Sequence, residues 1–562
     1  MSTELRYTEN NSPRAHYRRP AERPFTASER ERTTILIGGL TQRHERFIQA
    51  VFEGSGYRCE ILPTPDLTAF HVGKEYCNNG QCNPAYFTAG SLIQHLMNLE
   101  TQGLSRSEIE NRYVFFTAGC CGPCRFGMYD SEYQLALENA GFGGFRVLLF
   151  SQDDGVRQKT SEPGLKYTLD FGLGMLNAII LGDILNDLAY KLRPYEIVPG
   201  QTDDVLGLCV QDLCEHLRTH KCVDLLSRVP SWLSSQLTRR DTLRITLSVL
   251  YKLHHHLYGP AFREVLNSCR ARINAIALDR LRVKPVVKIV GEFWAQTTEG
   301  DGNYRMFSFL EREGAQVYPE SIGTWIAYLL SNARLRLHTR RGLDKQHQEP
   351  GRWELRRRWS NELDFQKKRA FLSSGEWMFT REHNRIGGVF RGLTKDLVSQ
   401  RELAHLARGF YHPLARGGEG HLEVSKNIYY TVHKLCHMVL SLKPFGCMPS
   451  SMSDGVQSAV VSHFKDMTFL PIETSGEGET NAHSRVQMAL GEAKTKAKAE
   501  FQAALASTGK AMEEIRNFVF RNPELQKPFY PIPARHGIAG VAANFVLHVS
   551  DVMNGRARLK HA

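Results

Sequence analysis

The stretch TTILIGGLTQRHERFIQAVFEGSGYRCEIL, residues 33–62, carries the pattern that decides the fold. Its first five residues, 33–37, are β-branched and apolar, which predicts a short buried strand. A helix is expected over 44–52 and ends at Gly54, after which 57–62 return to strand character. A strand, a helix and a second strand in this order predict a βαβ unit with parallel strands.

The same alternation continues along the chain. Further strands are expected at 113–117, 145–150, 285–290, 316–318 and 467–472. The sequence therefore predicts an α/β protein with parallel sheets and added helical segments. We expect a disordered basic tail (1–32), an α/β domain with cysteine loops (33–160), a mainly helical segment (161–283), a second α/β domain with a basic helical insertion (284–425), and a third α/β part with C-terminal helices (426–562).

Composition is ordinary for a globular protein, with 42% hydrophobic and 23% charged residues, so the chain can bury a sizeable core. No run of about 18 uncharged apolar residues is present, and the N-terminus lacks an apolar signal-peptide core. The closest candidate for a membrane span, 171–185, contains Asn177 and Asp183 and is better explained as a buried helix. We therefore expect a cytoplasmic protein without a membrane span.

The net charge is +12, and basic residues cluster between Arg334 and Arg369. This stretch is interpreted either as a solvated helical insertion or as a surface that attracts an acidic partner. No zinc-finger spacing or RNA-binding aromatic signature accompanies it, so a nucleic-acid partner is not expected.

Six of the 12 cysteines lie in short loops rich in Gly, Pro and Asn. These are Cys77 and Cys82 in CNNGQCNP, Cys120, Cys121 and Cys124 in GCCGPC, and Cys447 in FGCMP. Clustered thiols without a secretory signal favour metal or redox chemistry over a disulfide framework.

The pair Cys121 and Cys124 follows an expected strand and opens an expected helix, where the helix N-terminus favours a thiolate or an anionic cluster. The local spacing leaves four interpretations open: an iron–sulfur cluster, a zinc site, a thioredoxin-like redox pair and structural cysteines. A redox pair alone would not need the other loop cysteines. Of the other six, Cys436 lies upstream of Cys447, and the cysteines at 59, 209, 214, 222 and 269 lack this context and are expected in the core.

Two polar, Gly-rich loops, 291–303 and 473–479, each follow a strand and precede a helix, the position where α/β sheets bind ligands. Their acidic residues Glu292, Glu299 and Glu473 are candidates for substrate binding or proton transfer. No G-x-x-x-x-G-K-[ST] sequence is present, so any nucleotide hydrolysis of that type would belong to a partner.

Together, these segments resemble the proteins related to 2-hydroxyacyl-CoA dehydratases and their activases. The resemblance is closest to the cluster-bearing portion at the carboxyl side of large activase-related proteins. The resembling segments are 38–41, 73–84, 117–129, 291–303, 445–450 and 469–487. The chain lacks the activase portion of those fused proteins.

The resemblance implies two or three Rossmann-like domains with an iron–sulfur cluster in the cleft between them, either one 4Fe-4S cubane or a double cubane. Cys82, Cys121, Cys124 and Cys447 match the motif cysteines of the family, and Cys77 and Cys120 are adjacent extras. It also implies a separate ATP-hydrolysing activase that donates electrons.

The expected function is therefore that of an electron-transferring, metal-binding oxidoreductase component with a small-molecule or acyl-CoA substrate. A homodimer is compatible with this expectation. The alternatives are a non-catalytic electron carrier or assembly protein, and a zinc-stabilised scaffold.

Overall fold

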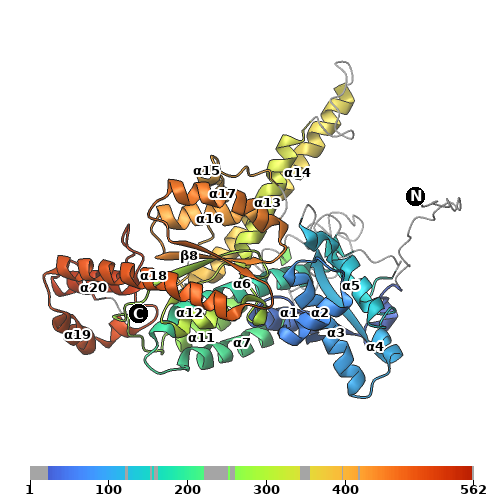
Figure 1. Cartoon of the computed structure of the whole chain (residues 1–562), viewed down its shortest axis with the longest axis horizontal. Coiled ribbons are helices and arrows are strands. Elements are labelled where there is room, and N and C mark those ends of the chain that lie inside the picture. The colour runs from blue at the N-terminus through green and yellow to red at the C-terminus, as the bar shows by residue number, and fades with distance from the viewer. Residues whose placement is uncertain are drawn as a thin grey trace, which may run out of the picture.

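Two parallel β-sheets, each covered by helices on both faces, form the body of the protein (Figure 1). The computed structural model describes residues 23–119, 124–151, 155–156, 162–219, 251–252, 260–341, 355–394, 396–415 and 418–559. The predicted α/β class with parallel sheets is confirmed.

The first sheet has the strand order β2-β1-β3-β4-β5. Its strands are β1 (Thr34–Ile37), β2 (Arg58–Ile61), β3 (Tyr113–Gly119), β4 (Arg146–Ser151) and the short antiparallel β5 (Gly155–Val156). Along β1, Ile35 and Ile37 pack into one apolar cluster, whereas Leu36 packs into another on the opposite face. This alternation follows from the two-residue repeat of a strand and explains why helices cover both faces.

Helices α1 (Gln42–Gly54) and α6 (Leu169–Leu192) cover one face of this sheet, and α3 (Asn83–Thr101) and α5 (Tyr129–Asn139) cover the other. The predicted helix at 44–52 is α1, which Thr41 caps by accepting a hydrogen bond from the His44 backbone N–H.

The second sheet has the order β7-β6-β8-β9, and all of its strands are parallel. They are β6 (Val286–Gly291), β7 (Gln316–Tyr318), β8 (Met438–Pro444) and β9 (Phe469–Thr474). The expectation of a third α/β part is therefore corrected, because β8 and β9 complete the second sheet and do not form a sheet of their own. Strand β8 supplies the pairing partner that β6 needs on its second edge.

Helix α6 links the two sheets, since it contacts α1 beside the first sheet and β7 in the second. Within the described residues, the one helix long and apolar enough to cross a membrane by length and composition alone runs from Leu169 to Tyr195. Its residues Asn177 and Asp183 are buried among neighbouring elements. This is the setting of a core helix, as the polar residues predicted.

The N-terminal region is more ordered than expected. Residues 1–22 lie outside the described part of the chain, but Phe25 is buried and Glu29 pairs with Arg146 at 3.1 Å. The expected disordered tail therefore does not extend to residue 32, because 23–32 pack against the first sheet.

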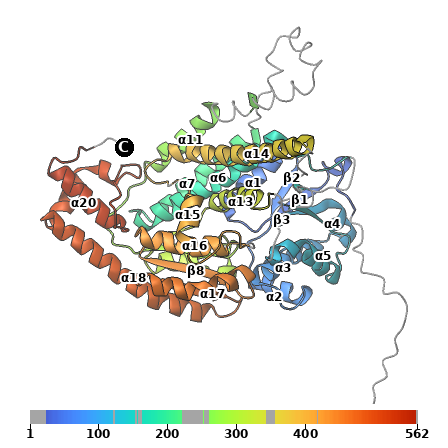
Figure 2. The same ribbon diagram turned by 90° about the horizontal axis from the view of Figure 1, so that it is seen from above.

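The basic stretch falls on two contacting helices, α13 (Ile322–Thr339) and α14 (Leu355–Val389), and residues 342–354 between them are outside the described part. Helix α14 projects beyond the body and exposes Trp359 and Phe371 (Figure 1). It runs along the side of the molecule opposite α2 (Leu67–Tyr76) and α17 (Met448–His463) (Figure 2).

The remaining helices complete the layers around the two sheets. They are α4 (Arg106–Arg112), α7 (Gln201–Thr219), α11 (Pro260–Ile273), α12 (Met306–Arg312), α15 (Gln400–Ala407), α16 (Gly420–Val432), α18 (Glu479–Thr508), α19 (Met512–Arg521) and α20 (Val541–Met553). The expected mainly helical segment, 161–283, contains α6, α7 and α11 among its described residues.

Candidate functional site

Three of the predicted ligand cysteines occupy the same local position, immediately before a helix. Cys82 precedes α3, Cys447 precedes α17, and Cys124 precedes the short 3₁₀ helix η2 (Arg125–Met128). In α3 and α17 a proline stands in the first turn, where its missing N–H costs no helical hydrogen bond. The free backbone N–H groups of these first turns favour negative charge beside the cysteines.

The loops that carry these cysteines meet between the two sheets. The Asn83 backbone N–H donates to the carbonyl oxygen of Phe445 at 3.3 Å. A Cβ atom added at Gly446 would lie 3.6 Å from the Cα atom of Cys82. A Cβ atom added at Gly418 would lie 3.9 Å from the Cβ atom of Cys124. It would also meet the side chain of Pro449, two residues after Cys447. The fold therefore brings together three segments that are distant in sequence.

Cys120 and Cys121, the other members of the GCCGPC loop, lie outside the described residues. Among the residues that the structure does describe, no group of three or more His, Cys, Asp or Glu side chains is arranged to hold a metal ion. The structure thus shows that the loops converge, and residues 120–123 of the GCCGPC loop lie outside the described part of the chain.

Burial controls the protonation of the described thiols. It raises the pKa of Cys82 and Cys447, and raises that of Cys77 to about 12. The buried Tyr129 hydroxyl, 3.0 Å from the Cys82 sulfur, partly offsets the effect at Cys82. Metal-free, these three groups are neutral thiols at pH 7, which disfavours a reactive thiolate role for them.

Two charged side chains adjoin the cysteines. Glu292 follows β6, accepts a hydrogen bond from the Ala295 backbone N–H at 2.9 Å, and has a pKa raised by burial to about 7. Its charge further raises the pKa of Cys82 and of Cys447, which places it near both. Arg125 donates to the backbone carbonyl of Gly80 and lowers the Cys82 pKa.

The other acidic candidates lie elsewhere. Glu299 accepts a hydrogen bond from the Gln42 backbone N–H at 2.9 Å and lines a separate cavity, whereas Glu473 is exposed near the end of β9. Of the three predicted carboxylates, only Glu292 is beside the cysteine loops.

Cys77 ends α2 and packs in the apolar cluster that includes Phe70 and Phe87. Cysteines 59, 209, 214 and 269 are buried as expected, and Cys222 lies outside the described residues.

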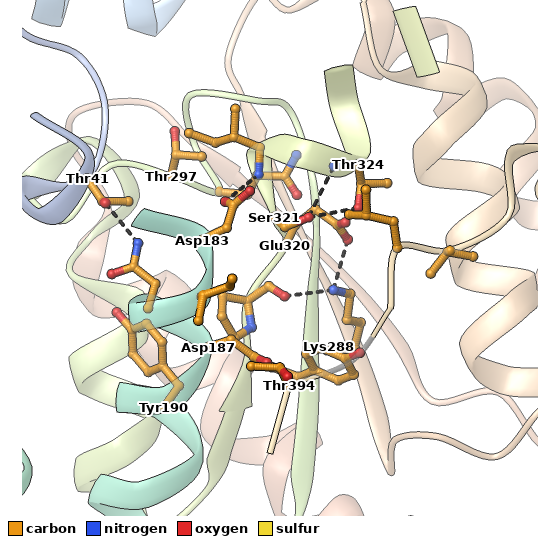
Figure 3. A pocket seen from close by; sticks show the side chains of 18 of the residues that line it. Thr41, Asp183, Asp187, Tyr190, Lys288, Thr297, Glu320, Ser321, Thr324 and Thr394 are labelled. Atoms are coloured by element: carbon orange, nitrogen blue, oxygen red, sulfur yellow. Dashed lines mark hydrogen bonds and ion pairs between the residues drawn. The ribbon is translucent and has the colours of Figure 1, made fainter. Parts of the chain in front are cut away.

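A second feature, which the sequence analysis did not predict, is a small cavity between the two sheets that is partly open to solvent. Its lining includes Thr41 and residues of α6, of β6 and the loop after it, of the end of β7 and of the start of α13 (Figure 3). Since parallel strands present ligand sites at their carboxyl ends, its position is that of a binding site.

A buried ion network forms one wall of this cavity. The Lys288 Nζ atom lies 2.8 Å from one carboxylate oxygen of Glu320 and donates to the Pro319 carbonyl at 2.9 Å (Figure 3). Lys426 lies 3.2 Å from the other oxygen of Glu320. Burial alone would raise the pKa of Glu320, but the two ammonium charges outweigh it and lower the pKa to about 2. The sequence signal was Lys288 inside an otherwise apolar strand, which requires a buried partner.

Comparison with known proteins gives no relative from which a function could be transferred. No protein-family model matches the chain, and no curated protein is similar to it at a significant level. The family suggested by the cysteine loops therefore stays a prediction, and the functional argument rests on the residues themselves.

Proposed function

We propose that the chain is the cluster-bearing component of a cytoplasmic, ATP-dependent low-potential reductase or 2-hydroxyacyl-CoA dehydratase-like system. The observation that carries the proposal is the meeting of the Cys82, Cys124 and Cys447 loops between two sheets. Three buried or half-buried cysteines from segments distant in sequence each stand immediately before a helix and on loops that meet.

The residues fit an iron–sulfur cluster in their donor chemistry. Cys82, Cys124 and Cys447 would be ligands, with Cys121 as the fourth, because cubane irons bind cysteine thiolates. The helix N-termini and Arg125 would stabilise the negative charge of such a group. Cys77 packs in the same apolar cluster as Cys82, and we propose one four-iron cluster held by the four motif cysteines without it.

When bound, the cluster would store one electron at low potential and pass it to a substrate. The chain's own residues prepare the site for this chemistry. The Tyr129 hydroxyl lies 3.0 Å from the Cys82 sulfur and would donate to it once Cys82 is a ligating thiolate, and hydrogen bonds to ligand sulfurs tune reduction potential. The Glu292 carboxyl can hold a proton near pH 7 at a position close to Cys82 and Cys447.

Metal analysis of the full chain, purified without oxygen, tests this proposal against a zinc scaffold. We expect about four iron and about four sulfide per chain, and a brown protein with broad absorption near about 400 nm. A colourless protein with about one zinc per chain would contradict the proposal, since zinc also accepts four thiolates. A protein that contains neither metal after reconstitution with iron and sulfide would contradict it as well.

The proposed electron donor is a separate ATP-hydrolysing activase, and the structure suggests where it would dock. Four exposed apolar side chains lie on the cysteine-bearing segments: Met128, Phe445, Met448 and Met452. The basic helix α14 lies across the molecule from α17, so it is a poor candidate for steering the donor to the cysteines (Figure 2). We therefore propose docking on the apolar side chains.

Met128→Glu is expected to slow ATP-dependent reduction of the cluster by at least about tenfold, because a buried charge at an apolar contact weakens binding. Stopped-flow bleaching of the absorption near about 400 nm, with limiting activase, measures this rate. Phe371→Glu on α14, where the apolar side chain is also exposed, is the matched control and should not change this rate. Equal slowing by both variants would contradict the docking site, and full ATP-dependent turnover by the chain alone would contradict the two-component system.

A further inference from the structure

The cavity between the two sheets has a strong excess of acidic groups. Among the described residues that line it, the acidic side chains are Asp183, Asp187, Glu299, Glu320 and Asp396, and the basic ones are Lys288 and two histidines, of which His44 lies 3.3 Å from Asp183. Lys191 and Lys426 pair with two of these carboxylates from outside the lining, and with both histidines counted as neutral an excess of two negative charges remains. The local potential is therefore negative although the whole chain is basic.

Two of the carboxylates have structural roles. Glu320 is held between Lys288 and Lys426. Asp183 accepts hydrogen bonds from the first backbone N–H groups of α13, those of Ile322 and Gly323, both at 2.7 Å. These groups are already neutralised by ammonium charges or by a helix N-terminus.

Other lining groups are not satisfied. One oxygen of Asp187 lies 2.5 Å from the Lys191 Nζ atom, whereas Oδ1 has no hydrogen-bond partner among the described residues. Gln296 is 6% exposed, and its amide nitrogen donates to the Gly291 carbonyl at 3.2 Å, so its oxygen is the free end. That oxygen is buried and likewise finds no donor in the described part of the chain.

His383 adds a third such group. It is 5% exposed, and its Nδ1 atom has no partner within the described ranges. Burial lowers its pKa, so the ring is neutral and Nδ1 can accept a hydrogen bond. Because buried acceptors without donors are costly, these three atoms indicate a ligand rich in hydrogen-bond donors.

We propose that this cavity binds a small organic cation, a primary ammonium or guanidinium group on a short apolar body. Such a group supplies several N–H donors and a positive charge, and the rings of Tyr190 and Phe307 in the lining suit both an apolar body and a cation. The excess negative charge disfavours phosphates and carboxylates. This site does not depend on the cluster.

Calorimetric titration of the full chain with matched four-carbon probes tests the proposal. We expect n-butylamine and n-butylguanidine to bind saturably with Kd of about 1 mM or tighter, n-butanol to bind at least about tenfold more weakly, and butyrate not to bind. Binding of butyrate as tightly as n-butylamine, or no binding of either amine, would overturn the proposal.

Variants locate the binding. Asp187→Asn should weaken n-butylamine binding at least about tenfold, because it removes the negative charge of the carboxylate whose Oδ1 atom is an unsatisfied acceptor. Asp396→Asn, at the exposed mouth of the cavity, should weaken it about threefold and does not endanger folding. Asp212→Asn on α7 is the control and should leave Kd unchanged. Asp212 lies 2.7 Å from Arg272 and is not part of the cavity lining. Unchanged binding in both cavity variants would refute the site.

Discussion

Replacing Cys447 with serine is expected to reduce the iron content of anaerobically purified protein about tenfold and to remove the absorption near about 400 nm. Cys447 is the proposed ligand from the segment of the second sheet, whereas Cys82 and Cys124 come from the segments of the first. Without Cys447, a cubane held by the remaining proposed ligands would keep one iron without a protein ligand. Iron and sulfide analysis of the purified variant measures the loss.

Cys209→Ser is the matched control for this experiment. Cys209 is also buried, but it lies in the helical core between α7 and α11, where its sulfur faces the Cys269 carbonyl at 3.9 Å. The iron content of the Cys209→Ser protein should equal that of the wild type. Cys77→Ser should also retain iron if one four-iron cluster is present. Equal iron in the Cys447→Ser protein and the wild type would mean that Cys447 is not a ligand.

Glu320→Gln is expected to lower the free energy of unfolding by about 3–5 kcal/mol, the range for breaking a buried charge network on one side. The substitution leaves the ammonium groups of Lys288 and Lys426 buried and facing each other without their carboxylate. The midpoint of urea unfolding, followed by circular dichroism at pH 7, measures the effect. Lys288→Met is the comparison and should cost less, because the Glu320–Lys426 pair survives in it.

The dependence on pH gives this prediction a second readout. The Glu320 pKa is about 2 in the folded protein against an ordinary value of 4.5, a difference that corresponds to about 3 kcal/mol. Because the folded pKa is the lower one, this stabilisation is complete above about pH 4.5 and is lost as the pH falls toward 2. The difference between the wild type and Glu320→Gln should therefore narrow below about pH 4.5. A difference that stays constant there would contradict the role of the ionised carboxylate.

Much of the fold could be predicted because its signals are local. The segments 33–37 and 316–318 are predicted as strands from their residue types and the glycines beside them, and the structure has β1 and β7 there. The prediction of a third α/β part was wrong because sheet membership depends on pairing between strands that are distant in sequence. Nothing in the local sequence of β8 indicates that it pairs with β6. The tail was predicted too long because the burial of Phe25 depends on the distant Gly164, which its ring contacts.

The two sites differ in the same way. The cysteine loops were recognisable because Gly and Pro beside cysteine are a local pattern, and Glu292 follows a predicted strand directly. The cavity was not recognisable, because its lining comes from segments between Thr41 and Tyr430 that become neighbours only in the folded chain. The one local signal from which a buried ion pair could have been predicted is Lys288, a charged residue in the interior of a buried strand.

Lys288 also has a consequence for how the second sheet assembles. Its neighbours Val287 and Ile289 face the apolar cluster under α12 and α18, whereas its own side chain points to the opposite face, between the rings of Tyr318 and Tyr430. If β6 slipped by one residue against β7 or β8, the ammonium group would enter that apolar cluster and lose Glu320. Folding intermediates with the wrong strand register would therefore be less stable than those with the native one. The ion network thus favours the correct register of β6 as the sheet forms.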